Sequence, residues 1–305
     1  MTDRVTAQPG IFAQGTRSHY HLEFDVDDSV AADDIAAAVG RLREPAVTSG
    51  GTNIVVGFGP DLWRRIEPDS APDALAPFEG IQSAAGSVPS TPHDVWVWLH
   101  GTGPDILLDT ARATKAALGQ CATLAAEQSC FVYLDSRDLT GFVDGTENPP
   151  LHEAPSVALI PPGEPGEGGA FVITMRWIHD LGAFHALALE EQEGVFGRIK
   201  PDSVELDDDT KPPTAHIARV VIEEPGDDGE PEELEIYRRS TPYGTVDEHG
   251  LYFVAFSADP SRFTKMLARM YGTSEDGLHD RLTEFTHPVS CAFYFAPPLE
   301  ALASL

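Results

Sequence analysis

The sequence predicts an α+β fold of two halves, each with the element order βαββαβ and an antiparallel sheet, which is the ferredoxin-like arrangement. Strand-like alternation of apolar residues and helix-like repeats occur in the same order twice along the chain. The 305 residues suffice for two domains of ordinary size, and 42% apolar with 23% charged residues is typical of a globular enzyme. We place the N-terminal half at residues 1–140 and the C-terminal half at 141–305.

The first half opens on the strand HYHLEF, in which apolar residues alternate with His19, His21 and Glu23. An alanine-rich helix follows, and Asp27 and Asp28 precede it as expected caps. A long Pro- and Ser-rich connection lies in the middle of this half. The predicted elements are strands at 52–59, 95–100 and 130–135 and helices at 29–43 and 104–118, after the first strand at 19–24.

The second half repeats this order after a loop rich in Pro, Gly and Glu. Phe263, Met266, Leu267 and Met270 have the i, i+3, i+4, i+7 spacing of an amphipathic helix, so these methionines are core packing rather than metal ligands. We expect the two sheets to pack face to face. The other predicted elements are strands at 171–180, 234–240, 251–258 and 291–298, a helix at 187–200 and an irregular acidic stretch at 202–209.

Charge and cysteine content narrow the class of protein. The 49 acidic and 20 basic residues give a net charge of −29, which disfavours nucleic acid and anionic membranes as partners. Three widely spaced cysteines without a CxxC motif indicate reduced thiols rather than disulfides or a zinc site. The N-terminus lacks the apolar core of a signal peptide, and no apolar run reaches membrane-spanning length. We therefore predict a cytoplasmic protein that binds neither nucleic acid nor membrane.

The motif GFVDGTENP places Asp144 between two glycines, directly after Phe142 and Val143. A carboxylate in such partly apolar surroundings is costly unless it accepts hydrogen bonds or transfers protons. An Asp–Gly turn after a strand is the simpler interpretation of the motif by itself. The rest of the chain has to decide between the turn and a catalytic carboxylate.

Two later segments supply possible partners for Asp144. His216, in TAHIARV, has apolar neighbours and is either a hydrogen-bonded core histidine or a ligand facing an apolar pocket. In YRRSTPYG, Arg238 and Arg239 are consecutive on a predicted strand, so only one of them faces inward. An inward Arg238 needs an anion, for which Asp144 is the candidate, and Arg239 then lies on the surface.

Four segments in this order resemble the dye-decolourising peroxidases, most closely their cytoplasmic B-type branch: GFVDGTENP, TAHIARV, RRSTPYG with HGLYFVAF, and FTHPVSCAFYFAP. The resemblance covers about residues 8–299. It implies two ferredoxin-like halves of the dimeric α/β barrel type, with one haem b per chain in the second half.

The resemblance also implies roles for individual residues around the haem. His216 corresponds to the proximal iron ligand, and Asp280 to a carboxylate that accepts the other ring N–H and thereby stabilises high-valent iron. Arg198 and Lys200 are candidates for contacts to the haem propionates, although a surface position at a helix end fits them equally well.

On the opposite, distal side, Asp144 and Arg238 correspond to the residues that act on peroxide. Ser240 takes a polar distal position that is commonly asparagine in part of the branch, so this chain departs from the pattern there. Phe253 corresponds to an apolar residue that shields the distal face of the haem. We expect Arg238 to matter more than Asp144 for the reaction.

The implied function is a haem peroxidase that uses hydrogen peroxide to oxidise dyes, phenolics or other one-electron donors through a ferryl intermediate. Bulky donors would deliver electrons through surface aromatic residues, for which Trp177 and Tyr243 are candidates. One alternative is a haem-handling or iron-release protein with incidental peroxidase activity, and another is an α+β binding module without haem. The expected partners are hydrogen peroxide, small-molecule reductants and further copies of the chain in a homo-oligomer.

Overall fold

The computed structural model describes residues 5–43, 51–226 and 229–305, and it confirms the predicted α+β class. In the first half the strands and long helices follow the predicted order, and the short helix α2 and the hairpin β3–β4 occupy the Pro- and Ser-rich connection. The elements are β1 (Ser18–Val26), α1 (Ala32–Gly40), β2 (Asn53–Phe58), α2 (Pro60–Ile66), β3 (Ile81–Ser83), β4 (Gly86–Val88), β5 (Val95–Gly101), α3 (Pro104–Leu118) and β6 (Ala122–Phe131).

Two boundaries predicted in this half are wrong. The last strand ends at Phe131 rather than continuing to 135, because Leu134 and Ser136 have φ values of 47° and 70°, which a strand does not accommodate. Helix α1 begins at Ala32, and Asp27 does not cap it. The Asp27 carboxylate instead accepts hydrogen bonds from the backbone and hydroxyl of Ser29 in the preceding turn.

The second half contains the predicted strands and the amphipathic helix α8, but short helices replace the single helix expected after its first strand. The principal elements are α4 (Ala154–Ala158), β7 (Ala170–His179), α5 (Leu181–Ala186), α6 (Leu189–Phe196), α7 (His216–Val220), β10 (Tyr237–Arg238), β11 (Thr241–Gly244), β12 (His249–Ser257), α8 (Ser261–Met270) and β13 (Thr286–Ala296). Smaller elements are β8 (Glu223–Pro225), β9 (Pro231–Glu233), α9 (Leu299–Ser304) and the 3₁₀ turns Pro9–Ile11, Arg41–Arg43 and Arg281–Glu284.

Local chemistry explains why the helix predicted at 187–200 is wrong. Helix α5 begins earlier because Asp180 caps it, its carboxylate accepting a hydrogen bond from the backbone of Ala183. Helix α6 ends at Gly197, whose φ of 82° is the left-handed conformation that commonly terminates helices. The strand predicted at 234–240 is likewise reduced to the two residues of β10.

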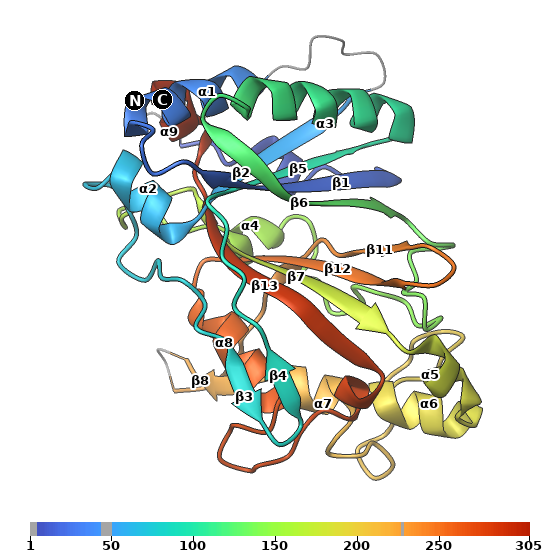
Figure 1. Ribbon diagram of the computed structural model, residues 1–305. Coiled ribbons are helices and arrows are strands. Elements are labelled where there is room, and N and C mark those ends of the chain that lie inside the picture. Colours follow the sequence, from blue (N-terminus) through green and yellow to red (C-terminus); the bar gives the residue numbers. More distant parts are fainter. Residues whose placement is uncertain (1–4, 44–50, 227–228) are drawn as a thin grey trace.

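The strands of both halves pair into one antiparallel sheet, in the order β10-β12-β7-β13-β2-β5-β1-β6, with β11 added to β12. Each half has the same internal order of second, third, first and fourth strand. The halves meet where Phe295 of β13 pairs with Phe58 of β2. The prediction of two separate sheets is therefore wrong, although the halves do face each other: Figure 1 shows their strands stacked, with α1 and α3 above and α7 and α8 below.

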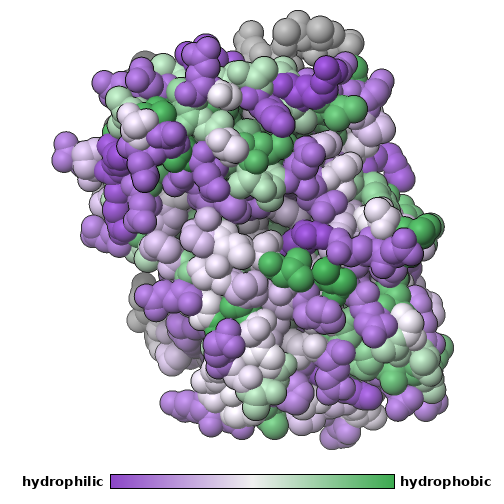
Figure 2. All heavy atoms as spheres, in the orientation of Figure 1, coloured by the Kyte–Doolittle hydropathy of each residue, from purple (hydrophilic) through white to green (hydrophobic). Residues whose placement is uncertain are grey.

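The sheet divides the core into two main layers. One lies between the strands and the outer helices, and the other fills the space between the two halves with large rings such as Trp96, Trp98, Tyr252 and Tyr294. On the face shown in Figure 2, hydrophilic residues dominate and hydrophobic residues form small groups, as the acidic composition leads one to expect. No helix within the described ranges is long and apolar enough to cross a membrane.

Candidate active site

A pocket opens in the second half between the outer face of the sheet and the helices α7 and α8. It encloses about 1510 Å³, including its open mouth. Strands β7 and β12 supply one apolar wall and α8 another, while the loop 138–147, which contains most of the GFVDGTENP motif, closes one side. Apolar residues that line it include Ile173, Met175, Phe253, Phe263, Leu267 and Met270.

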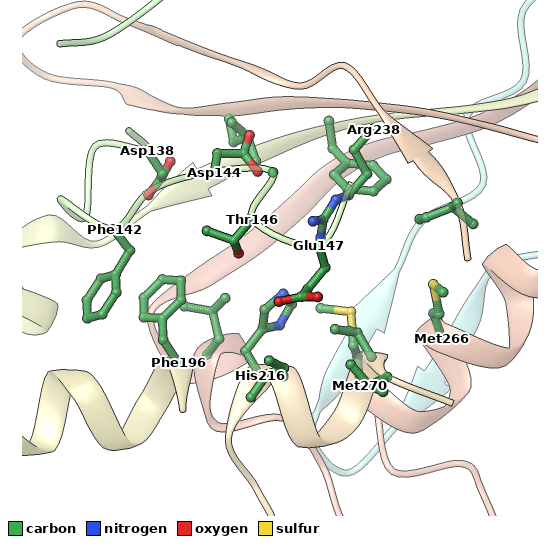
Figure 3. A pocket seen from close by; sticks show the side chains of 18 of the residues that line it. Asp138, Phe142, Asp144, Thr146, Glu147, Phe196, His216, Arg238, Met266 and Met270 are labelled. Atoms are coloured by element: carbon green, nitrogen blue, oxygen red, sulfur yellow. The ribbon is translucent and has the colours of Figure 1, made fainter. Parts of the chain in front are cut away.

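His216 begins α7 and projects into this pocket (Figure 3). Its Nδ1 lies 2.6 Å from Oδ2 of Asp280, a residue with 0% exposure. The other carboxylate oxygen of Asp280 accepts the backbone N–H of Leu282 at 2.8 Å, which fixes the carboxylate. Nδ1–H therefore donates to Asp280, and Nε2 is left without a hydrogen-bond partner in the described part of the chain. An imidazole nitrogen held in this way is suited to binding a metal.

Asp144 and Arg238 lie across the pocket from His216 (Figure 3). Burial raises the pKa of the Asp144 carboxyl above its usual value, although the positive charge of Arg238 opposes this shift. The pair is not in direct contact, because no ion pair within 4.0 Å joins the two among the described residues. Nε of Arg238 is buried and has no hydrogen-bond partner among the residues that the structure describes. The pocket thus contains a cation and a carboxylate with capacity to bind a further small molecule between them.

Asn148, from the same motif, fixes Arg238 and was missed by the sequence analysis. Its side-chain amide accepts the backbone N–H of Arg238 and donates to the carbonyl of Arg238, each at 2.8 Å. These two bonds attach the motif to β10. The signal was present in the sequence, because an asparagine four residues after Asp144 in a turn-rich segment is well placed for side-chain to backbone bonds.

Asp138 is a second residue that the sequence analysis missed. Burial alone would raise the pKa of this carboxyl, but hydrogen bonds from His179 and Thr140 outweigh burial and leave the pKa lowered. The distances are 3.0 Å to Nε2 of His179 and 2.6 Å to the hydroxyl of Thr140. The negative charge of Asp138 in turn contributes to the raised pKa of Asp144.

Phe253 lines the pocket from β12, whereas Ser240 does not line it. The Ser240 hydroxyl accepts the backbone N–H of Val254 at 3.3 Å, and the residue lines an adjoining pocket. Asp144 and Arg238 line both pockets and so lie between them. Ser240 is therefore placed on the other side of this pair from His216.

The two candidate contacts to propionates differ in position. Arg198 lines the pocket and forms ion pairs with Glu147 and, at 3.7 Å, with Glu205. Lys200 is not among the lining residues, and its ammonium donates to the side chain of Gln192 at 2.6 Å. Only Arg198 is available at the pocket wall.

Three residues predicted to lie on the surface do not: two are buried, and the third is held by hydrogen bonds to backbone carbonyls. Trp177 lines the pocket and is 6% exposed, and Tyr243 is 2% exposed and donates its hydroxyl to the carbonyl of Trp177 at 3.1 Å. Arg239 donates to the carbonyls of Ile11 and Ala13 at 2.5 and 2.7 Å. The prediction of surface positions was wrong because strand alternation alone does not tell that both faces of this sheet are covered.

Comparisons with known proteins agree with this architecture. The family models "Dyp-type peroxidase, N-terminal" and "Dyp-type peroxidase, C-terminal" match residues 8–132 and 135–301. A dye-decolorizing peroxidase of Rhodococcus erythropolis is 33% identical over 295 residues, covering 94% of this chain and 85% of the relative. A second, from Mycobacterium tuberculosis, is 33% identical over 253 residues, covering 82% and 74%.

Solved structures with the same fold include a putative Dyp-type peroxidase from Shewanella oneidensis, with a TM-score of 0.91, 33% identity and 99% coverage of both chains. A Rhodococcus jostii DypB variant in complex with heme has a TM-score of 0.89 and 33% identity, with coverage of 96% of this chain and 97% of the other. The chain belongs to the Dyp-type peroxidase family.

Proposed function

We propose that the chain is a haem peroxidase that reduces hydrogen peroxide and oxidises small one-electron donors such as dyes or phenolics. The observation that carries the proposal is that Nε2 of His216 faces an apolar pocket opposite Arg238. Neither this nitrogen nor the buried Nε of Arg238 has a hydrogen-bond partner among the described residues. The similar Rhodococcus jostii DypB, solved in complex with heme, supports the same cofactor here. The proposed complement is one haem b per chain.

The residues of the pocket fit a haem group. Nε2 of His216 is the available iron ligand, and Asp280 fixes the ring that carries it. The walls of the pocket are apolar on β7, β12 and α8, as a porphyrin requires, and Arg198 supplies a positive charge for a propionate. Bound haem would supply the redox chemistry that amino acid side chains lack.

The roles of Asp280 and His216 are linked by their hydrogen bond. Asp280 accepts the Nδ1 proton and leaves more electron density on Nε2, which makes His216 a stronger donor to a metal. Because Asp280 is fully buried, the bond is shielded from water and the ring keeps one orientation.

Asp144 and Arg238 are positioned to act on the peroxide molecule. Asp144 takes a proton from one peroxide oxygen and returns it to the other, which leaves as water. Its pKa is raised by burial, which makes the ionised carboxylate a stronger base than an ordinary aspartate. Arg238 places a positive charge where negative charge develops on the departing oxygen. Asn148 holds the backbone of Arg238 and so keeps this charge in position.

Stopped-flow measurement of the spectral change after mixing with peroxide tests this division of work. We expect Arg238→Leu to slow the reaction by about 10²–10³-fold, the loss typical of removing one transition-state charge donor. Asp144→Ala should slow the reaction less than Arg238→Leu does. The control is Arg112→Leu, at an exposed position of α3 in the other half, which should react at the wild-type rate. A wild-type rate for Arg238→Leu together with a stalled Asp144→Ala would contradict the proposed order.

The same preparation separates the peroxidase from an iron-release protein. A peroxidase turns over a phenolic donor many times per haem and keeps its iron. Release of iron to a chelator under reducing conditions, without donor turnover, would overturn the proposal. We also propose that the chain forms a homo-oligomer, which light scattering coupled to size-exclusion chromatography tests.

A further inference from the structure

The polar face of β1 is enclosed in the core between the two halves. His19, His21 and Glu23 alternate with apolar residues, a pattern that in an antiparallel sheet commonly marks the solvated face. Here the three are only 3%, 1% and 5% exposed. Burial lowers the pKa of His19 to about 3 and that of His21 well below its usual value, so both imidazoles are neutral.

Some buried polar atoms of this layer have no hydrogen-bond partner in the part of the chain that the structure describes, which is costly in a core. They include both ring nitrogens of His21 and the indole N–H of Trp96. The His21 ring stacks on Tyr252, with centroids 4.0 Å apart, and on Trp96 at 5.9 Å. The layer between the halves is therefore a stack of oxidisable rings with neutral bases among them.

Glu23 is the buried carboxylate of this layer, and phenols surround it. Tyr294 donates its hydroxyl to Oε1 of Glu23 at 2.9 Å, and the hydroxyl of Thr174 reaches the same oxygen at 3.4 Å. Tyr252 is close enough for the charge of Glu23 to add to the effect of burial in raising its pKa. A tyrosine loses its phenolic proton when it loses an electron, so a hydrogen-bonded carboxylate makes it easier to oxidise.

This layer lies directly behind the proposed haem pocket. Along β12, Leu251 and Phe253 line the pocket, and Tyr252 between them points to the opposite side. Along β7, Met175 lines the pocket, whereas the preceding residue Thr174 hydrogen-bonds to Glu23. Only the thickness of one strand layer separates the pocket from Tyr252. Tyr294 lies on β13 opposite Val172 of β7, next to the pocket residue Ile173.

We propose that Tyr294, with Tyr252 beside it, is an internal electron donor of the enzyme and that Glu23 is its proton acceptor. The idea rests on the proposed peroxidase function, which supplies the oxidant. Tyr294 gives one electron to the peroxide-oxidised cofactor and its phenolic proton to Glu23, which leaves a neutral tyrosyl radical and a protonated carboxyl. A one-electron donor later restores the electron, and Glu23 returns the proton.

Trp98 is the competing residue in this layer, and its surroundings disfavour it. Its indole N–H donates to Nδ1 of His19 at 3.1 Å, so it also has a base. The guanidinium of Arg239, however, lies 5.1 Å from the centre of a Trp98 ring. A fixed positive charge opposes removal of an electron from the indole, whereas the hydrogen bond from Tyr294 to Oε1 of Glu23 gives the phenolic proton an acceptor.

The test is electron paramagnetic resonance of the haem-loaded protein, frozen after one equivalent of hydrogen peroxide without a donor. We expect a radical signal whose hyperfine structure narrows when the protein contains ring-deuterated tyrosine. Tyr294→Phe should reduce this signal at least tenfold, and Glu23→Gln, which accepts the hydrogen bond but not the proton, should reduce it several-fold.

Tyr20→Phe is the matched control, because Tyr20 lies on β1 like Glu23 and donates its hydroxyl to another carboxylate, that of Glu127, at 3.0 Å on the exposed side. A signal unchanged in Tyr294→Phe, equally lost in Tyr20→Phe, or insensitive to tyrosine deuteration would overturn the inference. A Soret band that shifts with peroxide in all variants shows that the proposed function itself holds. A wild-type Soret band that does not respond to peroxide would overturn both.

Discussion

The two halves of the molecule have the same strand order, but the second is hollowed by the apolar pocket around His216. In the first half α1 follows β1 closely, and Ile35, Ala38 and Val39 of α1 pack into the core on the outer side of the sheet. In the second half the connection from β7 to β10 is longer and forms the short helices α5, α6 and α7. Both halves thus keep the same sheet, but in the second half short helices replace the single covering helix. They form a wall of the pocket, and the last of them, α7, begins with His216.

The comparison also shows how each half uses its buried polar residues. The second half places Asp144, Arg238 and His216 around a space large enough for a ligand. The first half places His19, His21 and Glu23 in a filled layer, where they contact aromatic rings. Because the layer around His19, His21 and Glu23 is filled, these side chains can take part only in electron or proton transfer. The pocket of the second half, in contrast, has room for a ligand.

Replacement of His216 tests the role assigned to the hollow half and should have the largest effect. We expect His216→Ala to lose the Soret absorbance after haem reconstitution, because no other described residue at that wall offers an unpaired imidazole nitrogen. The exposed His185→Ala on α5 is the control and should bind haem normally. Full haem occupancy in His216→Ala would contradict the assignment.

A pair of phenylalanine substitutions compares the filled half with the hollow one. Phe24 of β1 is 0% exposed, and Phe24→Ala should lower the free energy of unfolding by about 3–5 kcal/mol, the usual cost of such a core cavity. Phe253 already borders open space, so Phe253→Ala should lose less, on the order of 1–2 kcal/mol. Urea unfolding of the two variants, in the same cofactor state, measures both changes in the free energy of unfolding. Equal changes would contradict the comparison, because they would show that Phe253 is as tightly packed as Phe24.

Substitution of Asp280 weakens the support of His216 without removing the ligand. Asp280→Asn keeps a hydrogen-bond acceptor for Nδ1–H but removes the charge, and we expect haem affinity or peroxide reactivity to fall about 10–100-fold. The half-exposed Glu284→Gln nearby is the control. Unchanged affinity and reactivity in Asp280→Asn would show that the bond only orients the ring.

The pH dependence of the peroxide reaction reports on Asp144 and is the smallest expected effect. The reaction needs the ionised carboxylate, so its rate should fall as the pH drops through the pKa of Asp144, which lies above the ordinary 3.8 because burial raises it. Arg238, Asp138 and His216 are the charged or titratable groups that act on it. Asp144→Asn should lose this acidic limb, and a limb that persists would assign it to another group.

The sequence predicts the repeated architecture well, because apolar alternation and the stripe of α8 are local signals. Of the residues that the resemblance of four motifs puts around one site, Asp144, His216 and Arg238 line the same pocket, whereas Ser240 does not line it. The pairing of His216 with Asp280 was implied by that resemblance, and the structure places their atoms 2.6 Å apart. The boundary between the two halves at residue 140 stays a prediction. So do the roles of the six predicted site residues, Asp144, His216, Arg238, Ser240, Phe253 and Asp280.

Other features depend on contacts between distant parts of the chain and were not predictable from local patterns. The pairing of β13 with β2 joins residues far apart in the sequence, so the single sheet could not be foreseen. Burial of the polar face of β1 depends on the other half covering it. The position of Ser240 behind the distal pair depends on its hydrogen bond to the backbone of β12.

The pairing of β13 with β2 also bears on how the protein is made. β13 comes after every other strand in the chain, yet it completes the strand order of the second half and joins the halves. A chain emerging from the ribosome therefore cannot close its sheet until β13 has been made. Because β13 pairs with β7, the wall that β7 gives to the pocket is supported on both sides only from that moment on.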